Sequence, residues 1–279
     1  MAEGRAALAA TLRRAEDLYP RPGDETVLIV HGVRKELKRA ASLCRLFAPL
    51  VGAAAYEALD VANAARRSIG EARDLDILPQ ALNSLPCAPG TRDTLLRAVA
   101  IERSNLRGHR TDSDAARRRT ELAAAAAAVA NWDLGAEDPE ALLLSLRLTY
   151  RSAKRLGRAA WASHDADDLH ELRARVVDLG HQLAIVEPAW PALLGAAGAE
   201  LARLRQSLGL HNDLTVLGEF ALSRRELDSV EAESLVQLIL RKRRPLERRA
   251  QSQFERLFAE RPNAFARRIG AYLAFPQKR

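Results

Sequence analysis

The pattern of hydrophobic and polar positions along this chain is typical of an all-helical protein. No stretch alternates apolar and polar residues over six positions with β-branched content, so we predict no β-strand. Strong helix formers (Ala, Leu, Arg and Glu) dominate between the prolines. These segments predict helices at residues 2–18, 25–48, 52–83, 91–130, 138–162, 167–187, 191–221, 226–259 and 262–274. We expect a kink or loop at Gly108–Asp114.

The helix predicted at 25–48 has two chemically different faces. Its core side carries Val33, Leu37, Ala40, Leu43, Cys44 and Phe47. The opposite stripe is almost entirely cationic and contains His31, Arg34, Lys35, Lys38, Ser42 and Arg45. Like charges three or four residues apart on a helix repel by about a few tenths of a kcal/mol per pair. The stripe therefore favours an anionic ligand, and a solvated basic face is the alternative.

Positive charge is concentrated in three stretches of the chain. The net charge is +7, whereas residues 31–45, 147–158 and 241–249 alone carry +4, +5 and +5, so the remainder is acidic. The second stretch forms another cationic stripe, made of Arg147, Arg151, Lys154, Arg155 and Arg158. If these stretches meet in space, they form one site for a polyanion.

The sequence contains an internal repeat with a constant offset of 139 residues. Residues 31–49 align with residues 170–188, and residues 66–78 align with residues 205–217. The repeat predicts two related halves, residues 1–135 and 136–279, each with about four long helices and packed about a pseudo-two-fold axis.

Composition excludes several classes of protein. Two cysteines, Cys44 and Cys87, cannot form a disulfide framework or a cysteine-ligated zinc site, and a reducing cytoplasm is the expected compartment. No apolar run approaches the length of a membrane span, and the N-terminus lacks the apolar core of a signal peptide. No Walker loop, G-x-S-x-G elbow or C-x-x-C motif occurs, so we expect no enzyme activity.

Several short motifs together resemble the CHAD domain, the conserved histidine α-helical domain. They are H-x-x-R-K-x-x-K-R at His31–Arg39, H-x-x-R at His170–Arg173, R-D-L-D-I-L at Arg73–Leu78 and L-G-x-H-N-D-L at Leu208–Leu214. The resemblance spans about Val27 to Tyr272. It implies two pseudo-symmetric four-helix bundles around a basic central groove, which binds inorganic polyphosphate and associates with polyphosphate granules. It implies no cofactor.

The predicted ligands are basic side chains that suit a flexible phosphate chain. Arg can bond two phosphate oxygens at once, Lys supplies a compact charge, and a polyanion favours protonated His. The first set is His31, Arg34, Lys35, Lys38, Arg45, Arg66, Arg73, His170 and Arg173; the second is Arg147, Arg151, Lys154 and Arg155; the third is Arg205, His211, Arg241 and Arg248.

The second copy of the repeat is poorer in charge. Lys35, Lys38 and Arg39 correspond to Ala174, Val177 and Asp178. We therefore expect an asymmetric groove in which the first half supplies most of the cations. His181, one turn further along the same face, compensates in part.

Two other functions fit parts of the sequence. A metal-dependent phosphohydrolase is suggested by His164–Asp165, His170 and His211–Asp213, although basic neighbours of His31 would repel a divalent cation. A nucleic-acid-binding protein is the other alternative, since arginine stripes hold phosphates. Only 5% of residues are aromatic, which leaves little for stacking on bases.

Overall fold

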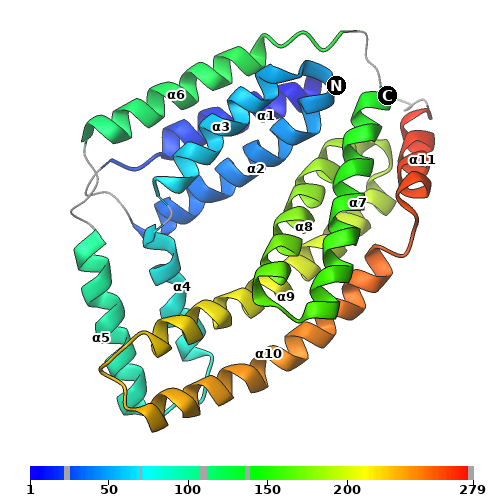
Figure 1. The fold of residues 1–279 in the computed structure, drawn as a ribbon. Helices are drawn as coiled ribbons and strands as arrows, with labels where there is room; N and C mark the ends of the chain where they lie inside the picture. Colours follow the sequence, from blue (N-terminus) through cyan, green and yellow to red (C-terminus); the bar gives the residue numbers. More distant parts are fainter. Residues whose placement is uncertain (22–25, 70, 107–111, 136–138, 276–279) are drawn as a thin grey trace.

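The fold is entirely helical in the part of the chain that the structure describes. The computed structural model describes residues 1–21, 26–69, 71–106, 112–135 and 139–275 (Figure 1). Its helices are α1 (Ala2–Leu18), α2 (Val27–Val51), α3 (Ala53–Arg67), α4 (Glu71–Asn83), α5 (Pro89–Leu106), α6 (Asp112–Ala130), α7 (Pro139–Ser163), α8 (Ala166–Val186), the 3-10 helix η1 (Glu187–Ala189), α9 (Pro191–Leu222), α10 (Ser229–Leu257) and α11 (Pro262–Leu273). The predicted all-α class is confirmed.

Two of the long helices predicted from the sequence are each divided. The segment predicted at 52–83 forms α3 and α4, because α3 ends at Arg67 and the Ser68 hydroxyl then bonds back to the Ala65 carbonyl at 2.9 Å. The segment predicted at 91–130 forms α5 and α6. Most of the expected loop at Gly108–Asp114 lies outside the described residues, and α6 begins within it at Asp112.

At two prolines inside helices, a side chain from a neighbouring helix replaces the missing backbone donor. Pro49 does not end its helix, contrary to the prediction, because α2 continues to Val51. A proline cannot donate to the carbonyl four residues earlier. For Pro49 that carbonyl belongs to Arg45 and accepts from the Ser145 hydroxyl of α7 at 3.2 Å. For Pro79 in α4 it is the Leu75 carbonyl, which accepts from Arg103 of α5 at 3.2 Å.

The hydrophobic core consists of two clusters that both cross the boundary between residues 135 and 136. The larger joins buried side chains of α1, α2, α3 and α6 with those of α7 to α11. The smaller joins α4 and α5 with α9 and α10. The N-terminal and C-terminal halves of the chain therefore share their core, and α2 packs directly against α7 and α8 (Figure 1).

None of the helices in the described ranges has both the length and the apolar character that crossing a bilayer requires.

Candidate functional site

The buried face of α2 lies where the hydrophobic pattern predicted it. Val33 and Leu37 are completely buried, while His31 and Lys35 are exposed and Lys38 is partly exposed. Thr26 starts the helix, since its side chain accepts from the Ile29 amide at 3.3 Å.

Arg34 belongs to this predicted stripe but points into the protein. It is only 8% exposed, and its Nη1 donates to the Arg66 carbonyl at 3.2 Å. That carbonyl lies in the last turn of α3, where carbonyl groups lack helical partners and the helix dipole favours a cation. Arg34 thus contributes to holding α3 against α2.

Four cations on two helices act electrostatically on one histidine. Lys35, Lys38 and Arg39 of α2 and Arg205 of α9 all act on His181 of α8. Burial, followed by these four positive charges, lowers the pKa of His181 from its ordinary value to about 4. His181 is therefore uncharged near neutral pH. We call this group of five side chains the His181 cluster.

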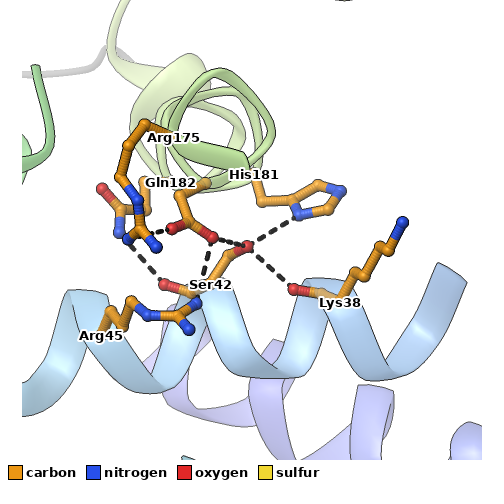
Figure 2. A network of polar contacts seen from close by, with 7 residues as sticks. Lys38, Ser42, Arg45, Arg175, His181 and Gln182 are labelled. Atoms are coloured by element: carbon orange, nitrogen blue, oxygen red, sulfur yellow. Dashed lines mark hydrogen bonds and ion pairs between the residues drawn. The ribbon is translucent and has the colours of Figure 1, made fainter. Parts of the chain in front are cut away.

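A buried polar network lies beside the cluster, between α2 and α8 (Figure 2). Ser42 is completely buried, and its Oγ lies 3.1 Å from His181 Nδ1, 2.7 Å from Asp178 Oδ1 and 2.8 Å from the Lys38 carbonyl. Gln182, also completely buried, donates from Nε2 to the Ser42 carbonyl at 3.1 Å. The network fixes α2 and α8 to each other.

Asp178 is the only acid in this network and pairs with two arginines. Arg45 donates to its Oδ1 at 3.1 Å, and Arg175 donates to its Oδ2 at 2.7 Å. The Asp178 side chain is only 6% exposed, whereas both arginines are about one-third exposed. Asp178, which corresponds to Arg39 in the internal repeat, therefore holds the two arginines Arg45 and Arg175. Sequence reasoning missed this role, and it also omitted Arg39, Arg175 and Gln182 from the site.

Replacing Asp178 by Asn should destabilise the fold. Asn retains an oxygen for the Ser42 hydroxyl but leaves Arg45 and Arg175 without their counter-charge, so we expect the free energy of unfolding to fall by about 2 kcal/mol. Urea unfolding measures this change.

The control is Glu200→Gln, which breaks the solvent-exposed i,i+3 pair with Arg203. It should cost less than about 0.5 kcal/mol. Equal losses from the two substitutions would contradict a structural role of the network.

Two predicted ligands on α8, His170 and Arg173, lie against α9. The exposed His170 has its Nδ1 2.8 Å from Asn212 Oδ1, which fixes the orientation of the imidazole ring. Arg173 lies against α9 at Gly209, where an added Cβ would be 3.4 Å from Arg173 Nε. The Arg173 guanidinium thus lies close to the backbone of α9 at this position. Arg205 is exposed on the same helix.

His211 is placed differently from the other predicted ligands. It is only 2% exposed, and its Nε2 lies 2.8 Å from Glu247 Oε1 and 2.9 Å from Arg243 Nε, both on α10. Burial and the charge of Arg243 lower the pKa of His211. Its contacts join α9 to α10.

Two members of the second cationic stripe, Arg147 and Lys154, bond to the C-terminal part of the chain. Arg147 donates to Asn263 Oδ1 of α11 at 3.2 Å. Lys154 donates to the carbonyls of Ala259 and Glu260, just before α11, at 3.2 and 2.7 Å. Burial and the charges of Arg158 and Arg261 lower the pKa of Lys154, against the effect of Glu260. The structure thus does not join these two side chains to the His181 cluster.

Most of the remaining predicted ligands lie at the surface. Arg151, Arg155, Arg241 and Arg248 are exposed on α7 and α10, and Arg66 is partly exposed on α3. The side chain of Arg73 lies outside the described part of α4.

The residues that suggested a metal site do not meet as a ligand set. Asp165 accepts from the amides of Asp167 and Asp168 and so caps α8, while His170 and His211 have the separate partners given above. In the described ranges, no three His, Cys, Asp or Glu side chains are grouped as metal ligands would be.

The chain matches the family model of the CHAD domain over residues 5–222. This match covers more than half of the chain, so the protein belongs to the CHAD domain family and the predicted resemblance is confirmed. The match starts earlier than expected from the motifs, at α1, and ends with α9, leaving α10 and α11 outside it. No curated protein matches the chain.

Proposed function

We propose that this protein binds inorganic polyphosphate, without turning it over, through cations carried by α2, α8 and α9. The observation that carries the proposal is the His181 cluster. Burial and then the charges of Arg205, Arg39, Lys38 and Lys35 lower the pKa of His181, so these four cations act on the same imidazole. Side chains of one charge repel each other, and a bound polyanion relieves that repulsion.

The ligand set that we propose consists of the cations next to solvent. Lys35, Lys38, Arg39 and Arg205 are its centre, and His31, Arg66 and His170 extend it along α2, α3 and α8. Arg34 and His211 support the helices on which these ligands lie. A row of such cations suits a phosphate chain, which offers repeated charges along a flexible backbone and no base edges to recognise.

The proposal includes two related halves that face each other across α2 and α8. It is supported by the helix bounds, because α3 and α4 moved by 139 residues fall at residues 192–206 and 210–222, within α9 (Pro191–Leu222). Ser42 and His181, which are in contact, are also 139 residues apart. Equivalent residues meet in this way when they lie near a pseudo-two-fold axis.

Competition binding tests the proposed function. Labelled long-chain polyphosphate is bound to the protein and then displaced by unlabelled polyphosphate, DNA, RNA or orthophosphate at matched ionic strength. We expect polyphosphate to displace the label at the lowest concentration of phosphate groups, and the length of the chain to be unchanged after incubation. Tighter binding of DNA than of polyphosphate would instead favour a nucleic-acid-binding protein.

We further propose that binding targets the protein to polyphosphate granules in the cytoplasm. Colocalisation of a fluorescent fusion with stained granules, lost in cells that lack polyphosphate, is the expected result.

A further inference from the structure

We propose that His181 is a proton-linked ligand: it is uncharged in the empty site and takes up a proton when a polyanion occupies the cations around it. The inference rests on the proposed function and adds the way in which pH regulates the same site.

The Ser42 hydroxyl determines which nitrogen of His181 carries the proton in the empty site. Asp178 Oδ1 and the Lys38 carbonyl are close to Ser42 Oγ, at 2.7 and 2.8 Å. A backbone carbonyl oxygen can only accept a hydrogen bond, and the same is true of an ionised Asp carboxylate. The single hydroxyl proton is therefore directed to one of these oxygens. Ser42 Oγ is left to accept from His181 Nδ1 at 3.1 Å (Figure 2).

The other nitrogen of the ring is the one that can gain a proton. With Nδ1 donating to Ser42, neutral His181 has an unprotonated Nε2, which points away from Ser42 (Figure 2). Protonation there leaves the Nδ1–Ser42 bond in place and creates a second donor. That donor can bond to a phosphate oxygen, with the gain in strength that two opposite charges give.

The charges around His181 decide when this proton is taken up. Lys35, Lys38 and Arg39 act on it from α2 and Arg205 acts from α9, while Asp178 reaches it through Ser42 and is itself balanced by Arg45 and Arg175. These cations and burial oppose the imidazolium in the empty protein. Bound phosphates offset the four cations and attract the imidazolium, so the pKa of His181 rises on binding.

The sign of the pH effect follows from linkage. The pKa of His181 is about 4 in the empty protein and higher in the complex, so between these two values the complex holds more protons. Binding then consumes protons and strengthens as the pH falls, by at most about tenfold per pH unit for one group. Above the pKa of the complex His181 makes no contribution to the pH dependence.

Calorimetric titration with long-chain polyphosphate counts these protons, because the heat measured in buffers of different ionisation enthalpy reports proton uptake. The wild type is compared with His181→Gln, which retains a donor toward Ser42, and with His164→Asn as a control at the exposed residue just before the α8 cap. At about pH 5.5 we expect His181→Gln to lose up to one proton of uptake and part of the gain in affinity that acid gives. His164→Asn should behave like the wild type. Equal uptake by the wild type and His181→Gln would overturn the inference.

A measurement on the wild type itself removes any dependence on how the variant folds. The nitrogen chemical shifts of the His181 ring, followed by NMR, should change from the neutral Nδ1–H form to the imidazolium when polyphosphate is added at about pH 5.5. Unchanged shifts in a protein that binds polyphosphate would overturn the inference and leave the proposed function standing. No binding at all would overturn both, and the titration shows this directly.

Discussion

Reversing the charges of Lys35 and Lys38 together (Lys35→Glu and Lys38→Glu) is expected to weaken polyphosphate binding by about two to three orders of magnitude. Each hydrogen bond between charged groups contributes about 1.5–3 kcal/mol, and two of them correspond to at least a hundredfold in affinity. The new carboxylates would also repel phosphate. Both lysines belong to the His181 cluster, and Lys35 is exposed and Lys38 partly exposed, so the helix itself should form as before. Fluorescence anisotropy with labelled polyphosphate measures the loss.

A matched control separates the loss of these ligands from a change in net charge. Arg119→Glu and Arg225→Glu remove the same total charge from α6 and from the segment between α9 and α10, and neither arginine acts on His181. We expect the control to lose less than about tenfold in affinity. If the lysine variant binds as well as the control does, the stripe on α2 is only a solvated basic face.

The affinity for polyphosphate should fall steeply with salt. When cations on a protein neutralise phosphates, the counterions of the polyanion are released, and the logarithm of the affinity falls linearly with the logarithm of the salt concentration. The proposed ligand set contains five Lys and Arg side chains: Lys35, Lys38, Arg39, Arg66 and Arg205. If each contacts one phosphate and contributes about 0.7 to the slope, the value for single strands, the affinity should fall roughly a hundredfold between about 50 and 200 mM salt. Binding isotherms at four or more salt concentrations give the slope.

Measuring the salt dependence of the lysine variant in the same way provides an internal check. With Lys35 and Lys38 reversed, two contacts are lost and the slope should be smaller by about 1.4. An affinity that stays flat over this range of salt would argue against a site made of cations, and for a different ligand held in a neutral pocket.

Most of the fold could be predicted from the sequence because the relevant signals are local. The spacing of Val33, Leu37, Ala40 and Phe47 defines the buried face of α2, and the same positions are completely buried in the structure. The helix ends were less accurate. Pro49 was expected to end α2, and the helix continues because Ser145, almost one hundred residues away in sequence, satisfies the carbonyl that the proline leaves without a partner.

For the candidate site, too, the sequence shows what depends on local spacing and does not show what depends on distant partners. A cationic stripe is visible in the sequence, and three cations of the same helix, Lys35, Lys38 and Arg39, act on the pKa of His181. The role of each basic residue is not visible, because it depends on its partner. Arg34 bonds to the end of α3, and Lys154 bonds to the segment before α11. Asp178 pairs with Arg45, which lies more than one hundred residues earlier in the sequence.

The sequence by itself determined the helical class, the family, the two-faced character of α2 and the concentration of positive charge in three stretches. Each of these depends on residue type and on spacing within one helix. Only the tertiary structure decided which cations lie together at His181 and which ones support helix ends. The physical reason is that a charge acts over a few ångströms in space, and the neighbours at that distance come from α2, α8 and α9, which only folding brings into contact.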